Sequence, residues 1–325
     1  MGSRLHPAAP LVGFVLVTAV MLMGCGSRHL DTSEAKARVG GFPIVVTDAQ
    51  GVEVTIATRP QRIVSASPAV TEILFGLGAS RRVVAVTNQC NYPPEADRLP
   101  RIGGFWTPSA ERALGARPDL VIGSRGNPPD FIAALRRSGV PVVTVDPNTL
   151  DDIFGTIRQV AQMIGDSLSG EDLVGVMNAR LQAISQRIGD VPERERPTAF
   201  LVLQVAPVWT AGAGTFQHDA IRAAGGRNIA GDLDGFKAYS TESLLANDPD
   251  FLLLSTMDGD PERMKREMLA SSAFRQLSAV KNRRLVVLEA DPLMRAGPRI
   301  VDAVEAMAQA FYPSRFSTPV GAGRR

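Results

Sequence analysis

The chain has 325 residues with 35 Lys plus Arg against 33 Asp plus Glu, which gives a formal net charge of +2. That length is enough for one large domain or two of ordinary size, each with a real hydrophobic core. The balanced charge and the lack of a long basic run exclude the strong positive field that nucleic-acid binding requires, so no nucleic acid is expected as a partner.

The first 25 residues have the pattern of an export signal. Arg4 supplies a positive charge, a mostly apolar stretch covers residues 11–23, and the segment LMGC ends at Cys25. The stretch is shorter than the roughly 20 residues of a membrane-spanning helix. We therefore predict a lipoprotein signal peptide over residues 1–25, with lipidation of Cys25 as the membrane anchor. The alternative is an ordinary secretory signal that is cleaved elsewhere.

A polar segment separates this signal from the first expected strand. Residues 26–41 show no periodicity, and we expect them to form a flexible tether. If Cys25 is lipidated, Cys90 is left as a lone cysteine without a partner for an internal disulfide.

The residues after the tether predict a first α/β lobe over 42–168. The segment FPIVVTDAQGVEVTI alternates around a polar turn and predicts a hairpin. Short β-type runs then alternate with amphipathic helices, which predicts a parallel sheet with right-handed crossovers. The expected strands cover 62–67, 82–88, 120–124 and 140–146, and the expected helices cover 69–78, 130–139 and 151–165.

A single long helix is expected next. The segment SGED at 169–172 resembles a helix capping box, and the pattern behind it predicts one continuous helix over 169–190. The expected apolar face of this helix consists of Leu173, Val176, Met177, Leu181, Ile184 and Ile188.

The α/β pattern restarts after this helix. It predicts a second lobe over 191–313, and the polar residues 314–325 are expected to be a disordered tail. The fold class is therefore α/β, with two similar α/β lobes that contain parallel sheets and are joined by one long α-helix.

One sequence unit occurs once in each lobe. SAERALGARPDLVIGS covers residues 109–124 and STESLLANDPDFLLLS covers 240–255, and the two align without a gap. Both predict a helix, a Pro-Asp turn and a buried strand. We infer that one supersecondary unit is used twice.

Loops that follow parallel strands are the expected place for a ligand. The chain has two Trp residues, and both are predicted in such loops, with Trp106 in GGFWTP and Trp209 in APVWTAGAG. Each could plug its own lobe, but a Trp at a matching place in each lobe favours a shared ligand face. The aromatic residues expected to extend this face are Phe105, Phe236 and Tyr239.

The segment DPLMRAGPR follows the last expected strand and brings Asp291 and Arg295 near the same crevice. A surface ion pair and a ligand contact are equally good interpretations of these two residues.

Glu111 and Glu242 occupy equivalent places in the repeated unit. Each lies in the first turn of an expected helix, where a carboxylate gains from the helix dipole. That capping role explains each glutamate separately but not why the two lobes present the same charge. A symmetric acidic pair would suit a basic partner with two-fold symmetry.

Motifs that carry catalysis are absent from the sequence. There is no Gly-x-Ser-x-Gly, Walker-type loop or Cys-x-x-Cys, and His218 is the one histidine beyond the tether, which excludes a multi-histidine zinc site. We predict no catalytic residues, no metal site and no cofactor. An enzyme that used the cleft would need an acid-base pair with perturbed pKa values, and the sequence offers no persuasive pair.

Taken together, residues 42–313 resemble the substrate-binding proteins of bacterial ABC importers. The similar class has two α/β lobes bridged by one long helix and captures cobalamin, ferric siderophores or haem. The phrases that carry the resemblance are RIVSASPAVTEILFGLGA, CNYPPEADRLPRIGGF, the two glutamate-containing repeats, AGGRNIA and MRAGPRIVDAVEAMA.

This resemblance implies partners and a location. Glu111 and Glu242 match the acidic residues that pair with arginines on the two membrane subunits of a two-fold symmetric permease, whose ATPase is a separate subunit. It implies a lipid-anchored monomer in the periplasm or on the outer face of the cell membrane.

The segments CNYPPEA and GGFW are most similar to cobalamin-binding members. By that resemblance Phe105 or Trp106, Trp209, Phe236 and Asp291 line the corrin pocket, while Gln89 stands where an aromatic residue is expected. Arg125 and Arg295 would instead suit a ferric siderophore, and Tyr92, Tyr239 and His218 would suit haem. We expect a cobalamin-type corrinoid as the ligand, with siderophore or haem as the alternative.

Overall fold

The computed structural model describes residues 41–256 and 260–316. The predicted signal peptide, Cys25, the tether up to residue 40 and the tail from residue 317 lie outside the described residues. Among the helices of the described part, none is both long and apolar enough to cross a membrane.

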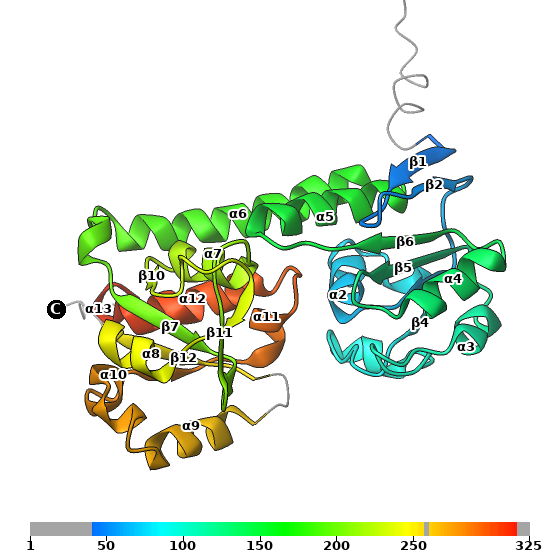
Figure 1. The fold of residues 1–325 in the computed structure, drawn as a ribbon. Coiled ribbons are helices and arrows are strands. Elements are labelled where there is room, and N and C mark those ends of the chain that lie inside the picture. The colour runs from blue at the N-terminus through cyan, green and yellow to red at the C-terminus, as the bar shows by residue number, and fades with distance from the viewer. Residues whose placement is uncertain (1–40, 257–259, 317–325) are drawn as a thin grey trace, which may run out of the picture. The chain divides into compact units, whose positions relative to one another are not determined.

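The elements alternate along the chain in two blocks, as Figure 1 shows. The strands are β1 Ile44–Thr47, β2 Glu53–Ile56, β3 Ile63–Ser65, β4 Val83–Val86, β5 Leu120–Ser124, β6 Val142–Val145, β7 Thr198–Val202, β8 Gln204–Val205, β9 Val208–Ala211, β10 Arg227–Asn228, β11 Phe236–Ala238, β12 Phe251–Leu254 and β13 Leu285–Val287. The helices are α2 Pro68–Gly76, α3 Ala110–Gly115, α4 Pro129–Arg137, α5 Leu150–Met163, α6 Ser167–Ile188, α7 Phe216–Ala223, α8 Thr241–Asn247, α9 Pro261–Ala270, α10 Ser278–Lys281, α11 Ala290–Met294, α12 Ile300–Phe311 and α13 Pro313–Phe316.

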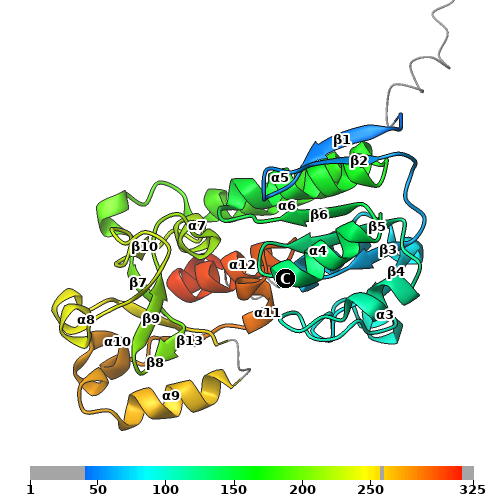
Figure 2. The ribbon, with the colours of Figure 1, turned by 45° about the vertical axis from the view of Figure 1, so that its right-hand side comes forward.

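Each lobe contains a four-stranded parallel sheet with the same strand order. The N-terminal lobe has the order β4-β3-β5-β6, which Figure 2 shows side by side, and the C-terminal lobe has β10-β7-β12-β13. In both sheets the first strand lies between the second and the third. The predicted two-lobed α/β class with parallel sheets is confirmed.

The repeated sequence unit forms the same structure in both lobes. Ser109 and Ser240 cap helices α3 and α8 by accepting a hydrogen bond from the backbone N–H three residues on. The residues before the two Pro-Asp turns, Arg117 and Asp248, both have positive φ, at 49° and 36°. Such φ values are unusual for residues other than glycine. The two units therefore share an uncommon backbone conformation at this turn.

The aspartate of each Pro-Asp turn ties the unit to the neighbouring strand. Asp119 accepts hydrogen bonds from the backbone N–H groups of Gln61 and Arg62 at 2.7 and 2.9 Å, just before β3. Asp250 accepts from the backbone N–H and the hydroxyl of Thr198 at 2.8 Å, at the start of β7. Each repeated unit therefore contains a serine that caps its helix and an aspartate that bonds to the neighbouring strand.

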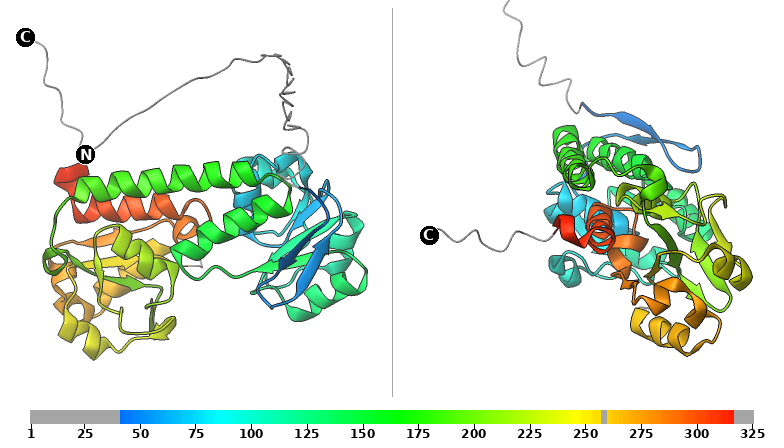
Figure 3. Two further views of the ribbon diagram at one scale, coloured as in Figure 1. Left: turned by 90° about the horizontal axis from the view of Figure 1, so that it is seen from above. Right: turned by 90° about the vertical axis from the view of Figure 1, so that its left-hand side faces the viewer.

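Helix α6 connects the two lobes. It packs beside α5 at its start and beside α12 along its later turns, as Figure 3 shows from above. Arg180 of α6 pairs with Asp302 and Glu305 of α12 at 2.7 and 2.9 Å. The buried side chains Val174, Met177, Ile184 and Ile188 belong to one hydrophobic cluster that also includes residues of both lobes.

Helix α6 differs from its predicted form in two respects. It begins at Ser167 with Asp166 as N-cap, so the predicted capping box at 169–172 lies inside the helix. Val176, which was predicted on the apolar face, is 60% exposed because α5 and α12 contact other faces of the helix.

Three segments that were predicted as irregular are regular. Trp209 lies in β9, which pairs with β8 and β11 in a separate antiparallel sheet. Residues 290–294 after β13 form helix α11. Helix α13 covers the first described residues of the predicted tail.

The predicted hairpin is β1–β2, and its turn is fixed by a buried aspartate. The carboxylate of Asp48 accepts from the backbone N–H groups of Gln50 and Val52, from the Thr144 hydroxyl at 2.8 Å and from Arg136 at 2.5 Å. Burial raises the pKa of Asp48, but the hydrogen bonds from Val52, Thr144 and Gln50 and the charge of Arg136 outweigh it, so the net pKa lies below the ordinary value.

We expect Asp48→Asn to lower the free energy of unfolding by about 2 kcal/mol at neutral pH, because the buried donors lose a charged acceptor. A carboxyl with a lowered folded-state pKa stabilises the fold above its unfolded pKa, and this stabilisation is lost as the pH falls through the folded value. The difference between the native chain and the variant in urea denaturation should therefore shrink from pH 7 to pH 3. A difference that grows towards pH 3 would contradict the assignment.

Candidate ligand-binding site

A cleft of about 490 Å³ lies at the carboxyl ends of the N-terminal strands. The segments after all four strands line it, with Ser67 after β3, Gln89 after β4, Ser124 at the end of β5 and Asn148 after β6. The opposite side comes from the C-terminal lobe, through the start of α7, Phe236 of β11 and residues 290–291 and 294–296. Open α/β sheets bind ligands at this end of their strands.

An aromatic pair forms one wall of the cleft. The rings of Phe105 and Trp106 have centroids 4.6 Å apart and planes at 80°. The Phe105 ring rests on Gly126, where a Cβ atom would come within 2.9 Å of it. The side-chain oxygen of Gln89 accepts a hydrogen bond from the Phe105 N–H at 2.8 Å, which holds this loop in place. Trp106 is 61% exposed and therefore presents its ring for contact.

Side chains of the C-terminal lobe complete an aromatic and amide lining. Phe236 is 45% exposed and faces the cleft from β11, and Phe216 and Gln217 line it from α7. The side-chain oxygen of Gln217 is buried and has no hydrogen-bond partner among the described residues. A donor group on a bound ligand would satisfy it.

Charged groups of the two lobes meet beside the cleft in what we call the interlobe ion cluster, defined by Glu72, Asp291, Arg295 and Arg299. The carboxylate of Glu72 on α2 accepts from Arg295 at 3.0 Å and from Arg299 at 2.6 Å. Its side chain is only 2% exposed. Asp291 accepts from Arg295 at 2.8 Å and lies 3.8 Å from Arg299. Two arginines of one lobe thus share a buried carboxylate of the other.

The two guanidinium groups of this cluster have further partners. Arg295 also donates to the Asn91 side chain at 2.8 Å and to the Gln89 carbonyl at 3.0 Å. Arg299 lies 3.9 Å from the centroid of the Tyr92 ring. Burial lowers the pKa of Arg299, but its hydrogen bonds to Glu72 and the nearby carboxylates outweigh that effect and raise the pKa overall. Arg299 therefore stays charged at any physiological pH.

Five of the predicted ligand residues lie in this cleft. They are Phe105, Trp106, Phe236, Asp291 and Arg295. Three others are outside its lining. Arg125 is a 69% exposed side chain that pairs with Asp146 at 3.1 Å. Trp209 takes part in the antiparallel sheet opposite Gln204 and Ala238, and Tyr239 packs on Phe200 with centroids 4.9 Å apart.

The residues considered for haem and for a disulfide also lie away from the cleft lining. His218 contacts Asn228 at 3.2 Å, and burial lowers its pKa. Cys90 is a buried free cysteine whose sulfur lies 3.1 Å from the hydroxyls of Thr71 and Thr87.

Glu111 and Glu242 are exposed in the first turns of α3 and α8. In both helices the preceding serine makes the N-terminal cap, so neither glutamate is needed as the capping residue. Both carboxylates are therefore available to a partner.

A family model described as periplasmic binding protein matches residues 63–292. The chain belongs to this family. It is 29% identical over 308 residues to an ABC transporter substrate-binding lipoprotein of Bacillus subtilis, covering 93% of this chain and 96% of that protein. It is 32% identical over 248 residues to a vitamin B12-binding protein of Vibrio cholerae, covering 75% of this chain and 87% of that one.

A solved structure has a fold similar to that of this periplasmic binding protein. The periplasmic haem-binding protein from Roseiflexus sp. RS-1 matches with a TM-score of 0.69 and 32% identity, over 78% of this chain and 99% of that one. Proteins of this family are extracytoplasmic substrate-binding components of ABC transporters and not enzymes. The relatives include binders of B12 and of haem, so the family does not by itself fix the ligand.

Sequence reasoning missed several residues that line the cleft of this periplasmic binding protein. Asn148 follows β6 directly, so the rule that loops after strands hold the ligand was a sufficient signal for it. Phe216, Gln217 and Met294 lie on helices, where an apolar or amide side chain in the sequence looks like ordinary core. Only the packing of α7 and α11 directs them to the cleft.

Proposed function

We propose that this protein captures a cobalamin-type corrinoid in the cleft and delivers it to an ABC import permease. The observation that carries the proposal is the chemistry of the lining, with an aromatic wall at Phe105 and Trp106, a facing Phe236, and amide and carboxylate groups around them. A corrin is a broad, nearly flat ring edged with amides. Such a ligand needs stacking surfaces and hydrogen-bond acceptors rather than free cations.

The arginines in and near the cleft do not favour an anionic iron chelate as the ligand. Arg295 is the one arginine of the lining, and its guanidinium already donates to Glu72, Asp291, Asn91 and Gln89. Arg125 lies outside the lining and pairs with Asp146. Among the described residues that line the cleft, no arginine is therefore left without a carboxylate partner.

Haem is the second candidate because the Roseiflexus haem-binding protein is as similar in sequence as the Vibrio B12-binding protein, at 32% identity each. Haem usually takes an axial Tyr or His and cations for its propionates. The described residues that line the cleft include neither Tyr nor His. The lining thus favours a corrinoid over haem.

Delivery is proposed to use Glu111 and Glu242, one exposed carboxylate at the same place in each lobe. These would pair with basic residues on the two subunits of a two-fold symmetric permease, with ATP hydrolysed by a separate subunit. A lipid on Cys25 would hold the monomeric protein at the outer face of the membrane. Residues 26–41 would act as a tether that lets the folded part move away from the membrane surface.

The test is a titration of the chain that begins at residue 26. Every described element lies after residue 43, so this chain retains all of the described helices and strands. Cyanocobalamin, haemin and a ferric hydroxamate are added in turn while tryptophan fluorescence is followed. Saturable quenching by cyanocobalamin alone supports the proposal, whereas saturation by haemin or the hydroxamate alone would replace the proposed ligand.

The two tryptophans make a matched pair for locating the ligand. Trp106→Ala should weaken cyanocobalamin binding at least tenfold, because it removes an exposed ring of the cleft wall. Trp209→Ala should change the affinity less than about twofold, because Trp209 is outside the lining. Calorimetric titration measures both. Equal losses in the two variants would show that the ligand also covers β9.

A further inference from the structure

A second hollow, of about 720 Å³, lies on the C-terminal lobe away from the cleft. It is formed at the amino ends of the parallel strands, by Pro197 before β7, Arg227 of β10, Phe251 of β12 and Arg284 before β13. The ligand cleft lies at the carboxyl ends of the N-terminal strands, whereas this hollow lies at the amino ends of the C-terminal strands. We call this second hollow the basic pocket.

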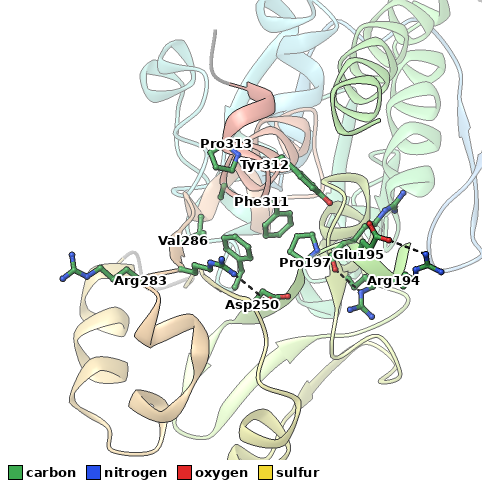
Figure 4. A pocket seen from close by; sticks show the side chains of 14 residues that line it. Arg194, Glu195, Pro197, Asp250, Arg283, Val286, Phe311, Tyr312 and Pro313 are labelled. Atoms are coloured by element: carbon green, nitrogen blue, oxygen red, sulfur yellow. Dashed lines mark hydrogen bonds and ion pairs between the residues drawn. The ribbon is translucent and has the colours of Figure 1, made fainter. Parts of the chain in front are cut away.

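Arginine dominates the lining of the basic pocket. The arginines are Arg194, Arg196, Arg227, Arg283 and Arg284, and the carboxylates are Glu195 and Asp250. Five cations against two anions leave a surplus of three positive charges. Figure 4 shows Arg194 and Arg283 on opposite sides of the pocket, with Pro197 and Phe311 between them.

The two carboxylates are already engaged. Glu195 pairs with Arg194 at 3.5 Å, and Asp250 lies 3.7 Å from Arg284 while it accepts two hydrogen bonds from Thr198. Among residues 41–256 and 260–316, the side chains of Arg196, Arg227 and Arg283 have no carboxylate partner. A chain with a net charge of only +2 therefore concentrates unpaired cations at one place.

Three of the arginines of the basic pocket are on the surface but each makes a contact within the protein. Arg227 donates its Nε–H to the carbonyl of Arg196 at 3.2 Å, and Arg284 lies over the Phe251 ring at 5.4 Å from its centroid. Arg283, in contrast, extends outwards at the edge of the view in Figure 4. Arg196 donates its Nε–H to the carbonyl of Val191 at 3.4 Å. Arg196, Arg227 and Arg284 are thus the lining arginines whose positions are fixed by such contacts.

The floor of the basic pocket is apolar. Phe251 and Phe311 meet with ring centroids 5.0 Å apart at 62°, and Pro197, Val286 and Pro313 surround them. A rim of guanidinium groups over an aromatic floor suits a small anion that carries an apolar part. A bare surface arginine patch would not need such a floor.

We propose that the basic pocket binds a phosphate-bearing anion through Arg196, Arg227 and Arg284. Guanidinium groups bind phosphate oxygens through paired, charge-assisted hydrogen bonds, and an apolar substituent of the ligand would lie on Phe251 and Phe311. This proposal does not depend on the cargo of the cleft. The phosphate can come from a soluble phosphate compound or from a lipid headgroup, and these two sources share the same chemistry.

The test uses the chain from residue 26 and two water-soluble probes at low salt. Inorganic pyrophosphate represents a soluble anion, and dihexanoyl phosphatidylglycerol, below its micelle concentration, represents a headgroup with an apolar part. Dihexanoyl phosphatidylcholine has the same chains without net charge. We expect calorimetric binding of at least one anionic probe, weakened by added salt, and no binding of the choline lipid. Stronger binding of pyrophosphate indicates a soluble ligand, and stronger binding of the glycerol lipid indicates a headgroup.

Arg227→Gln with Arg284→Gln should weaken that binding at least tenfold. Arg81→Gln with Arg98→Gln, two exposed arginines of the other lobe, is the matched control and should leave it unchanged. The Lys versions at 227 and 284 keep the charge and should retain part of the affinity. Cyanocobalamin titration and circular dichroism verify that each variant is folded, and they report on the cleft separately. Binding of neither anionic probe, or binding unchanged in the Gln double variant, overturns the proposal.

Discussion

Replacing Glu72 by Gln is expected to lower the free energy of unfolding by about 3 kcal/mol, because it leaves two mostly buried guanidinium groups without their shared carboxylate. The side chains of Arg295 and Arg299 are only 12% and 15% exposed, so water cannot take the place of Glu72. Both arginines belong to the other lobe. Urea denaturation followed by circular dichroism measures the loss.

The same substitution should also weaken ligand binding. Arg295 and Asp291 line the cleft, and the contact with Glu72 helps to fix where they stand. We expect the affinity for cyanocobalamin to fall at least fivefold even at temperatures where the variant is fully folded. A variant that is destabilised but binds normally would show that the interlobe ion cluster stabilises the fold without positioning the cleft.

Glu171 provides the control for Glu72. It is also a helical glutamate paired with an arginine, Arg158, at 3.0 Å, but its side chain is 60% exposed. Exposed ion pairs contribute little, so Glu171→Gln should cost less than about 1 kcal/mol. Equal losses for Glu72→Gln and Glu171→Gln would contradict the importance given to burial.

Glu111→Ala combined with Glu242→Ala should abolish uptake of cobalamin by cells while the affinity for cyanocobalamin stays within about twofold. The two glutamates are exposed and away from the cleft lining, so their removal changes only the surface offered to the permease. Each single variant should retain part of the uptake, because one docking contact remains. Transport of labelled cobalamin into cells lacking the native chain measures the effect.

The control for docking is a second pair of first-turn carboxylates, one in each lobe. Asp130 lies in the first turn of α4 and Glu262 in the first turn of α9, and both are exposed. Asp130→Ala with Glu262→Ala removes the same charge from the same kind of position and should leave uptake unchanged. If this pair lowers uptake equally, total charge rather than the position of Glu111 and Glu242 controls docking. If ligand affinity falls in the first pair, those glutamates do not act by docking.

Much of the architecture could be read from local patterns. The alternation of strands and helices, the repeat in each lobe and the long helix after residue 166 follow from periodicity and turn chemistry, which act over a few residues. The repeat predicted a common unit, but not that its aspartates, Asp119 and Asp250, fix the strands that precede it. Those hydrogen bonds join segments 58 and 52 residues apart.

The site was predicted less completely than the fold. Phe105, Trp106 and Phe236 could be placed at the cleft from their position after strands or beside glycines. Trp209 looked equivalent to Trp106 in the sequence, yet it lies in an antiparallel strand outside the lining. The sequence around Trp209 carries turn residues on both sides, and local signals cannot show that two short segments will pair across such a turn.

The sequence by itself determined the α/β class, the two similar lobes, the connecting helix and the matched glutamates, because each depends on residues that are close along the chain. Only the tertiary structure decided what the charged residues do. In the sequence, Glu72 looks like an ordinary helical residue and Arg295 like a possible ligand contact. Folding brings these two residues, 223 positions apart, together as a mostly buried ion pair. It likewise gathers Arg196, Arg227 and Arg284 at one end of a sheet. Ion pairs and pockets depend on distances between remote segments, and those distances exist only once the lobes have packed.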